Sequence, residues 1–393
     1  NNTQAEKQCK GLCVLSIVEQ GGIVLTRVDE VLQFLEENLD VDHVENAKNR
    51  LKRVINYEKP DRLSVKTNFP FTGFKGYCYS EAYEDMEKMM VNELLGICSG
   101  AVAKDDTMPM LRANYGVGTL PSLFGLNCKI VNNSMPWVDH VGNEVEIRKL
   151  IERGVPDIKA GLGARIFETH EYYSEKLVKY PKCKKMIHVY HPDLQGPFDV
   201  SHLIWGPEIY YAVYDEPQLV HDLMKLVTET YIKFMTEIKK TINDEEKDES
   251  GTYNYHWGSL YRGRIVLRDD TPVNLSKEMY EEFVKPYDEQ ILKAFGEGSI
   301  HYCGRADQWV FSMMECEGLG GMNFGQPPNM VFGFEWLEKI YDEAEKRKIA
   351  CIIYGMPKED MTKLPGTKFE TGVSYSTGVS NKDEAIALIN SVK

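Results

Sequence analysis

A histidine and a cysteine two residues apart are the strongest chemical signal in this sequence. His301 and Cys303 stand in the segment Ile-His-Tyr-Cys-Gly-Arg at 300–305. Residues two apart on an extended strand point to the same side, and imidazole with thiolate suits Zn²⁺. Gly304 allows the chain to turn sharply after the pair. We therefore predict a metal site here, against the simpler interpretation of a core histidine beside a buried thiol.

Three further polar segments follow apolar runs and are candidate substrate-binding segments. Segment 191–199 is rich in Gly and Pro, 253–270 places aromatic residues beside arginines, and 323–327 carries side-chain amides. Arginines next to aromatic rings suit a flat anionic ligand. A plain turn, an exposed charged loop and local backbone hydrogen bonding are the respective structural alternatives. The candidate substrate-binding residues are His191, Gln195, His256, Arg264, Asn323 and Gln326.

Alternating strands and helices must position these groups. Predicted strands lie at 185–190, 252–258, 299–302, 320–324, 350–354 and 372–376, and a first strand begins at 63–65. Predicted helices lie at 28–39, 44–57, 81–95, 216–242, 277–295, 336–346 and 382–392. This alternation predicts an α/β fold with a parallel sheet. Seven or eight such units fit a (β/α)₈ TIM barrel at 61–393, preceded by an N-terminal helical extension at 1–60. A doubly wound open sheet is the alternative.

Composition limits the class of function. The chain has 393 residues, with 46 Lys and Arg against 60 Asp and Glu, which gives a formal charge of −14. This acidic balance argues against nucleic-acid binding, which needs a basic surface, and no apolar run is long enough to span a membrane. The nine cysteines lack disulfide-framework spacing, so we expect reduced thiols and a cytoplasmic protein. The charge-dense segment 243–250 is expected to be a solvated surface turn.

The order of several short motifs resembles the uroporphyrinogen decarboxylase superfamily. The motifs are Lys-Pro-Asp-Arg at 59–62, Leu-Gln-Gly-Pro-Phe at 194–198, Asp-Glu-Pro at 215–217, Lys-Pro-Tyr at 285–287 and His-Tyr-Cys-Gly at 301–304. The resemblance runs from about residue 61 to the C-terminus, and it implies a (β/α)₈ barrel with its pocket at the C-terminal mouth. The superfamily contains metal-free decarboxylases of acidic tetrapyrroles and zinc-dependent methyltransferases that work with corrinoid proteins.

The chain matches one branch in part and departs from both. His301 and Cys303 match the metal-binding pair of the methyltransferases. Thr377 stands where the methyltransferases carry a cysteine and the decarboxylases a histidine, and it is a candidate substrate contact instead. A zinc site therefore needs a different third ligand, for which Asp270 is the first candidate and His256 the second.

The resemblance implies a zinc-dependent methyltransferase that moves a methyl group between a small methylated substrate or a thiol and a corrinoid protein. The expected cofactors are zinc and a corrinoid carried by the partner protein. The first alternative is a decarboxylase-type lyase, in which arginines pair with the carboxylates of an acidic tetrapyrrole; the candidates are Arg112, Arg262, Arg264 and Arg268. The second is a non-catalytic barrel that binds a tetrapyrrole or a corrinoid protein. The methyl donor, the methyl acceptor and a homodimeric state stay open.

Overall fold

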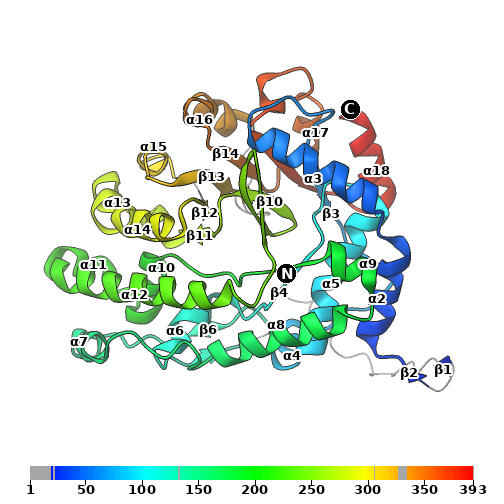
Figure 1. Ribbon diagram of the computed structural model, residues 1–393. Helices are drawn as coiled ribbons and strands as arrows, with labels where there is room; N and C mark the ends of the chain where they lie inside the picture. The colour runs from blue at the N-terminus through cyan, green and yellow to red at the C-terminus, as the bar shows by residue number, and fades with distance from the viewer. Residues whose placement is uncertain (1–18, 21–22, 132, 305, 326–333, 393) are drawn as a thin grey trace.

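Eight parallel strands form the centre of the computed structural model, which describes residues 19–20, 23–131, 133–304, 306–325 and 334–392 (Figure 1). The strands are β3 (Val65–Asn68), β4 (Met110–Arg112), β7 (His188–Tyr190), β11 (Val266–Arg268), β12 (Gly298–Tyr302), β13 (Leu319–Phe324), β14 (Ala350–Ile353) and β15 (Val373–Gly378). Six form one sheet in the order β11-β12-β13-β14-β15-β3, and β4 pairs with β7. The expected α/β fold with a parallel sheet is confirmed.

The ladder of backbone hydrogen bonds between these strands has two breaks, between β3 and β4 and between β7 and β11. Side chains bridge both breaks. The carboxylates of Asp105 and Asp106 accept the N–H groups of Thr67 and Val65 on β3. The ring of His191 accepts the N–H of Val266 on β11, 3.2 Å away. The strand ladder therefore does not close into a complete barrel.

Helices alternate with the strands and surround them in Figure 1. They are α4 (Tyr79–Glu84), α5 (Met86–Ala103), α6 (Thr119–Leu123), α7 (Glu144–Arg153), α8 (Gly163–Leu177), α9 (Pro181–Met186), α10 (Pro197–Trp205), α11 (Ile209–Asp215), α12 (Pro217–Ile238), α13 (Lys277–Phe283), α14 (Lys285–Phe295), α15 (Val310–Met313), α16 (Phe334–Arg347), α17 (Lys358–Met361) and α18 (Lys382–Ser391). The predicted helix 277–295 is two helices, because Pro286 cannot donate a backbone hydrogen bond and starts a new helix.

Short elements complete the chain. They are the strands β1 (Glu19–Gln20), β2 (Ile23–Val24), β5 (Cys128–Lys129) and β6 (Trp137–Val138) and the 3₁₀ turns η1 (Gly116–Gly118), η2 (Thr271–Asn274) and η3 (Lys368–Glu370). Within the described residues, we find no helix with the length and apolar character needed to cross a membrane.

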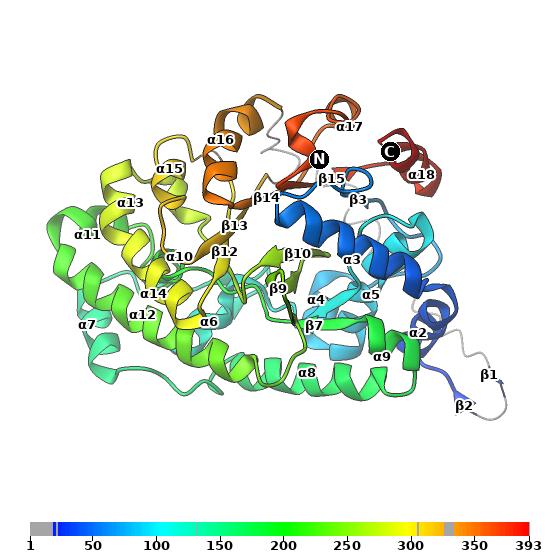
Figure 2. The ribbon, with the colours of Figure 1, turned by 45° about the horizontal axis from the view of Figure 1, so that its top comes forward.

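Two N-terminal helices, α2 (Arg27–Asn38) and α3 (Val41–Ile55), confirm the helices predicted before residue 60. Their N-caps, Thr26 and Asp40, each accept a backbone N–H from the first helical turn. The α3 helix lies against β10, β14 and β15 (Figure 2). A buried ion cluster fastens α3 to the strands, because Arg50 of α3 contacts Asp106 beside β3.

The segment predicted as strand 252–258 does contain a strand, but its assignment to the parallel sheet is wrong. It forms an antiparallel sheet of β8 (Glu245–Asp248), β9 (Gly251–His256) and β10 (Ser259–Arg262). Tyr261 of β10 packs with Val266 of β11 and Ile352 of β14. The β9–β10 hairpin therefore lies against the inner face of the main sheet, in the middle of the ring of strands (Figure 1). The fourth parallel strand is β11, which was not among the predicted strands and lies in the candidate substrate-binding segment 253–270.

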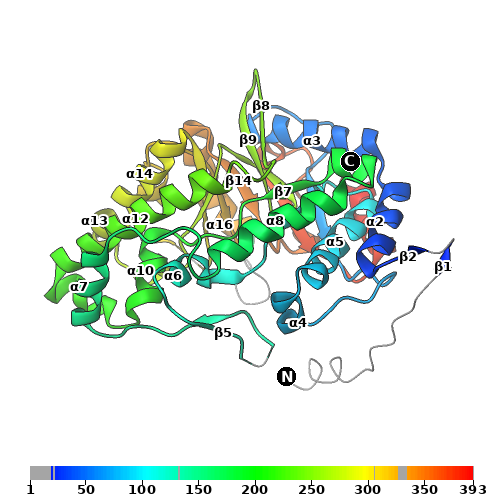
Figure 3. The same cartoon turned by 60° about the horizontal axis from the view of Figure 1, so that its bottom comes forward.

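The charge-dense segment 243–250 is also more ordered than expected. It contains strand β8, which pairs with β9 and projects from the body of the molecule (Figure 3). The acidic side chains of β8 pair with basic ones from neighbouring elements: Glu246 with Lys48 and Lys52, and Glu245 with Lys239. Cross-element ion pairs therefore order a segment whose composition alone indicates solvent exposure.

Candidate metal centre

Asp270, His301 and Cys303 come together at the carboxyl ends of β11 and β12. Their ligand atoms all lie within 4.8 Å of one another. The Nε2 atom of His301 is 3.2 Å from the Cys303 sulfur and 3.3 Å from the Asp270 carboxylate. The backbone N–H of Cys303 donates to Asp270, which holds the two loops together. We call these three residues the metal triad.

Strand alternation directs His301 to the inside of the sheet. Its neighbours Ile300 and Tyr302 belong to the core cluster that also contains Trp309, on the helix-covered side. Successive side chains on a strand point to opposite faces, so His301 faces the β9–β10 hairpin. Its ring contacts the indole of Trp257 at the hairpin turn, with 4.9 Å between ring centroids.

Asn323 sets the tautomer of His301. The two residues are direct neighbours on β13 and β12. The Asn323 amide donates to the carbonyl of Ile352, so its oxygen faces Nδ1 of His301. An amide oxygen only accepts, and Nδ1 therefore carries the proton, while the Nε2 lone pair faces Cys303 and Asp270. This is the arrangement that second-shell partners impose on metal-binding histidines.

Asp270 and Cys303 of the triad differ in charge at neutral pH. Burial raises the pKa of Asp270, but the Arg268 guanidinium outweighs burial, so the net pKa lies below the usual range. Burial and the nearby Asp270 carboxylate raise the pKa of the Cys303 thiol. Asp270 is therefore an anion at neutral pH, and Cys303 keeps its proton until a cation displaces it.

The triad fits a zinc ion by chemistry and by spacing. Zinc bonds of about 2.0–2.3 Å in tetrahedral geometry place neighbouring ligand atoms about 3.4–3.6 Å apart. The separations of 3.2 and 3.3 Å from His301 Nε2 are close to these values. Three protein ligands with one open position are typical of catalytic zinc. Asp270, the first candidate for the third ligand, lies beside the pair, whereas His256 approaches Asp193.

A second group of charged residues shares Asp270 with the triad. It consists of Arg112, Asp193, Arg268 and Asp270, and we call it the mouth cluster. Asp193 accepts hydrogen bonds from both arginines, and Arg268 also donates to Asp270 at 3.1 Å. The Nε–H of Arg268 is buried without a hydrogen-bond partner among the described residues, whereas Nε of Arg112 lies 3.6 Å from the Glu93 carboxylate. Buried charged donors are normally paired, so the Arg268 Nε–H marks a place where a ligand or water can bind.

The hairpin turn that carries Trp257 is strained. Trp257 has φ of 45° and Gly258 has φ of 74°, the pattern of a tight hairpin turn with two left-handed residues. A large non-glycine residue rarely adopts this conformation. Trp257 keeps it while its indole N–H donates to Asp193 and the Arg268 guanidinium stacks 5.1 Å from its ring centroid. The turn thus delivers an aromatic wall to the mouth.

The predicted substrate-binding residues separate into different places. Gln195 donates to Asp270, and Asn323 binds His301, so both support the triad. Thr377 is buried on β15 beside Thr67 of β3. Gln326 lies outside the described residues.

The other three predicted residues are not directly at the triad. Both ring nitrogens of His191 contact backbone groups, at Pro192 and Val266. His256 is fully buried in the hairpin, with neither ring nitrogen in a hydrogen bond. Arg264 precedes β11 and pairs with Glu245, so it lies at the amino end of the strand, opposite Asp270.

Several residues at the mouth were not among the site residues predicted from the sequence. Lys66 was unassigned, Asp193 and Trp257 lay in the candidate segments 191–199 and 253–270 but were not chosen individually, and Arg112 and Arg268 were named individually only for the lyase alternative. Arg112 closes β4, a strand of three residues that is too short to give a clear pattern. Trp257 carried a signal in the Trp-Gly dipeptide, because glycine at a hairpin turn favours the left-handed region.

Comparison with known proteins shows a likeness in structure but none in sequence. No protein-family model and no curated protein matches the sequence significantly. The structure is similar to that of a methyltransferase from Methanosarcina mazei, with a TM-score of 0.60 and 14% sequence identity. The likeness covers 88% of this chain and 97% of that chain. At this identity the comparison establishes that the two chains share a fold over nearly their whole lengths.

Proposed function

We propose that this protein is a zinc-dependent methyltransferase whose site lies at the carboxyl ends of a barrel-like ring of eight parallel strands. The observation that carries the proposal is the metal triad, in which a tautomer-fixed histidine, a thiol and a carboxylate converge. The shared fold with a methyltransferase supports this class. A metal held in this way supplies a Lewis acid that can activate a thiol acceptor or the leaving heteroatom of a methyl donor.

The residues around the triad have distinct roles in this proposal. His301, Cys303 and Asp270 hold the metal, and Asn323 keeps the Nε2 lone pair of His301 directed at it. Arg268 keeps Asp270 ionised. Cys303 releases its proton when the metal binds. Trp257 covers the His301 ring and limits the access of water from the hairpin side.

The finer proposal concerns the partners of the reaction. The methyl group moves between a small methylated substrate or thiol and a corrinoid carried by a separate protein, as the motif resemblance implies. The site lies at the carboxyl ends of the strands, the end at which enzymes built on parallel β/α units bind their substrates. A corrinoid protein would therefore approach this end of the molecule.

The arrangement of arginines disfavours the lyase alternative. A polyacidic tetrapyrrole needs several unpaired cations in one pocket. Arg112 and Arg268 already share Asp193. Arg262 and Arg264 pair with Glu297 and Glu245 before β12 and β11, at the amino ends of the strands. The four arginines thus do not form one free basic pocket.

Elemental analysis of the purified protein tests the proposal. We expect about one zinc per chain after preparation under reducing conditions without chelator. Cys303→Ser and Asp270→Asn should lose most of it. Cys351→Ser is the matched control, because Cys351 is buried at the start of β14, away from the triad, and should keep its zinc. Zinc-free wild-type protein, or equal zinc in the Cys303 and Cys351 variants, would refute the metal centre.

Activity is tested with free methylcobalamin and a small thiol. Formation of the methyl thioether by the zinc-loaded wild type, and its loss in Cys303→Ser, supports methyl transfer. A zinc-loaded protein that binds methylcobalamin without turnover is instead a binding module.

A further inference from the structure

A cavity of about 260 Å³ lies behind Trp257, on the side of β3 and β4. Its walls include Lys66 of β3, Glu93 of α5, Met108, Met110, Tyr190 and Trp257. The methionines and aromatic rings contribute apolar surface, and Lys66 contributes a positive charge, while Glu93 pairs with Arg112. Trp257 forms a wall of this cavity and also contacts His301, so one side chain separates the cavity from the metal triad.

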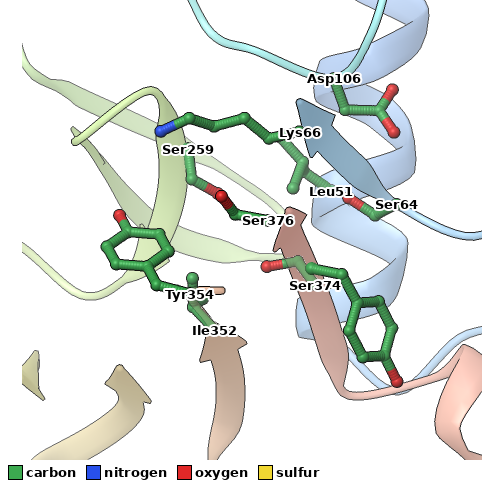
Figure 4. Close-up of a pocket in the computed structure, with 10 residues that line it drawn as sticks. Leu51, Ser64, Lys66, Asp106, Ser259, Ile352, Tyr354, Ser374 and Ser376 are labelled. Atoms are coloured by element: carbon green, nitrogen blue, oxygen red, sulfur yellow. The ribbon is translucent and has the colours of Figure 1, made fainter. Parts of the chain in front are cut away.

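Lys66 is a partly buried cation without a carboxylate partner among the described residues. Its ammonium donates to the carbonyl of Trp257 and lies 5.4 Å from the ring centroid of Tyr354. In Figure 4 its side chain is extended, with the amino group pointing away from the Asp106 carboxylate. Other largely buried lysines differ: Lys52 pairs with Glu246 and Asp248, and Lys239 pairs with Asp244 and Glu245.

The nearest acidic group does not neutralise Lys66 directly. Asp105 accepts from the backbone N–H and hydroxyl of Thr67 and from the N–H of Thr107. Burial lowers the pKa of Lys66 to about 8, although the Asp105 charge acts in the opposite direction. The Lys66 ammonium has three N–H donors. The Trp257 carbonyl accepts from one of them, so the others can donate to a ligand in the cavity. Partial burial of a positive charge costs free energy unless an anion pairs with it.

We propose that this cavity binds a small organic monoanion, with its charged end against Lys66 and its apolar body along Met108, Met110, Tyr190 and Trp257. Glu93 on another wall already pairs with Arg112, whose Nε lies 3.6 Å from the Glu93 carboxylate, so Lys66 is the uncompensated charge of the lining and matches one negative charge. Any role of this ligand in catalysis rests on the proposed function. Trp257 lines both the cavity and the metal triad, so a ligand in the cavity would lie next to the metal. Anion binding at Lys66 does not itself require the metal.

A matched pair of ligands tests this inference on the full-length protein. We choose 3-(methylthio)propionate and its neutral counterpart 3-(methylthio)propan-1-ol, and measure both affinities by calorimetry or saturation-transfer NMR. The acid should bind wild-type protein at least about tenfold more tightly than the alcohol, because a hydrogen bond to a charged group is stronger than a neutral one. Lys66→Met, which keeps the length of the side chain, should abolish this preference. Lys159→Met, at an exposed lysine that lines a separate cavity, should keep it.

The outcomes separate this site from the metal centre. Zinc content is measured for every variant, and binding is repeated after removal of the metal. Acid preference that survives metal removal and disappears in Lys66→Met supports the anion site, even if the metal proposal fails. Equal binding of acid and alcohol to the wild type, or an unchanged preference in Lys66→Met, overturns it, whatever the zinc content.

Discussion

Two clusters of two arginines and two aspartates can be compared directly in this protein. The anchor cluster of Arg50, Asp61, Arg62 and Asp106 joins α3 to the break between β3 and β4. The mouth cluster of Arg112, Asp193, Arg268 and Asp270 lies at the carboxyl ends of β4, β7 and β11. They have the same residue types and the same formal charge, so any difference between them comes from their geometry.

The anchor cluster uses its hydrogen-bonding groups internally. Arg50 forms a two-pronged contact with Asp61, and Arg62 forms another with Asp106. Asp106 also accepts the N–H of Val65 on β3. The mouth cluster instead leaves the Nε–H of Arg268 without a hydrogen-bond partner among the described residues, and Arg112 turns its Nε to Glu93, outside the cluster. A saturated cluster fastens elements together, whereas an unsaturated one keeps binding capacity next to the metal triad.

The largest expected effect is loss of stability at the anchor. Asp106→Ala leaves the Arg50 and Arg62 guanidiniums without their shared buried partner, which should cost about 3–5 kcal/mol of unfolding free energy. Urea denaturation measures it. Asp61→Ala is the control, since Asp61 is 67% exposed and its surface ion pair should contribute no more than about 1 kcal/mol. Equal costs for the two variants would contradict the role given to Asp106.

The next effect is on metal affinity and should appear only at the mouth. Asn323→Leu removes the acceptor that fixes the His301 tautomer, and zinc affinity should fall about 10- to 100-fold. Competition with a chelator of known affinity measures the change. Asp61→Ala, at the anchor, should leave zinc affinity as in the wild type. An Asn323→Leu protein that folds and binds zinc normally would show that the hydrogen bond does not position the ligand.

Low pH should destabilise the region of the mouth cluster more than that of the anchor cluster, because a buried neutral histidine lies next to the mouth cluster. Burial, assisted by the neighbouring His191, holds the pKa of His256 well below its ordinary value. The unfolded chain takes up a proton below about pH 6.5 and the folded one does not, so stability falls as the pH drops below 6.5. His256→Gln should flatten this fall by about 1.4 kcal/mol per pH unit. Parallel stability–pH curves for the two proteins would argue against a neutral buried His256.

The smallest expected effect concerns the turn that brings Trp257 to the mouth. Gly258→Ala places a Cβ on a residue with φ of 74°, which should destabilise the protein by about 1 kcal/mol. Gly96→Ala is the matched control in α5, where a Cβ meets nothing within 4 Å, and it should stabilise by up to about 1 kcal/mol. Thermal denaturation compares the two, and effects of the same sign would show that the turn is unstrained.

The sequence located the chemistry of the triad more reliably than its surroundings. The His301–Cys303 spacing needed only strand alternation, and Asp270 was a candidate because the resemblance left the third ligand position open at Thr377; the structure brings these three together. The helices at 28–39 and 44–57 followed from apolar periodicity over many residues. Strands β4 and β11 have only three residues each, and such short segments carry no measurable period.

The β9–β10 hairpin shows what local pattern cannot distinguish. Segment 252–258 has the alternation and aromatic content of a strand, and it is a strand. Its partners are β8 and β10 rather than the main sheet, and pairing depends on contacts distant in sequence. The error displaced His256, because its place depended on treating 252–258 as a parallel strand.

The sequence alone determined the α/β class, the N-terminal helices and the pairing of His301 with Cys303 on one side of a strand, because periodicity and short spacing are local properties. Tertiary structure decided which carboxylate joins that pair, which arginines are saturated, and which lysine stays without a counterion. Each of those outcomes depends on distances between residues tens to hundreds of positions apart, such as Arg112 and Asp193 or Lys66 and Trp257. Chain connectivity does not fix such distances, and they are set only when the strands, the hairpin and α3 pack together.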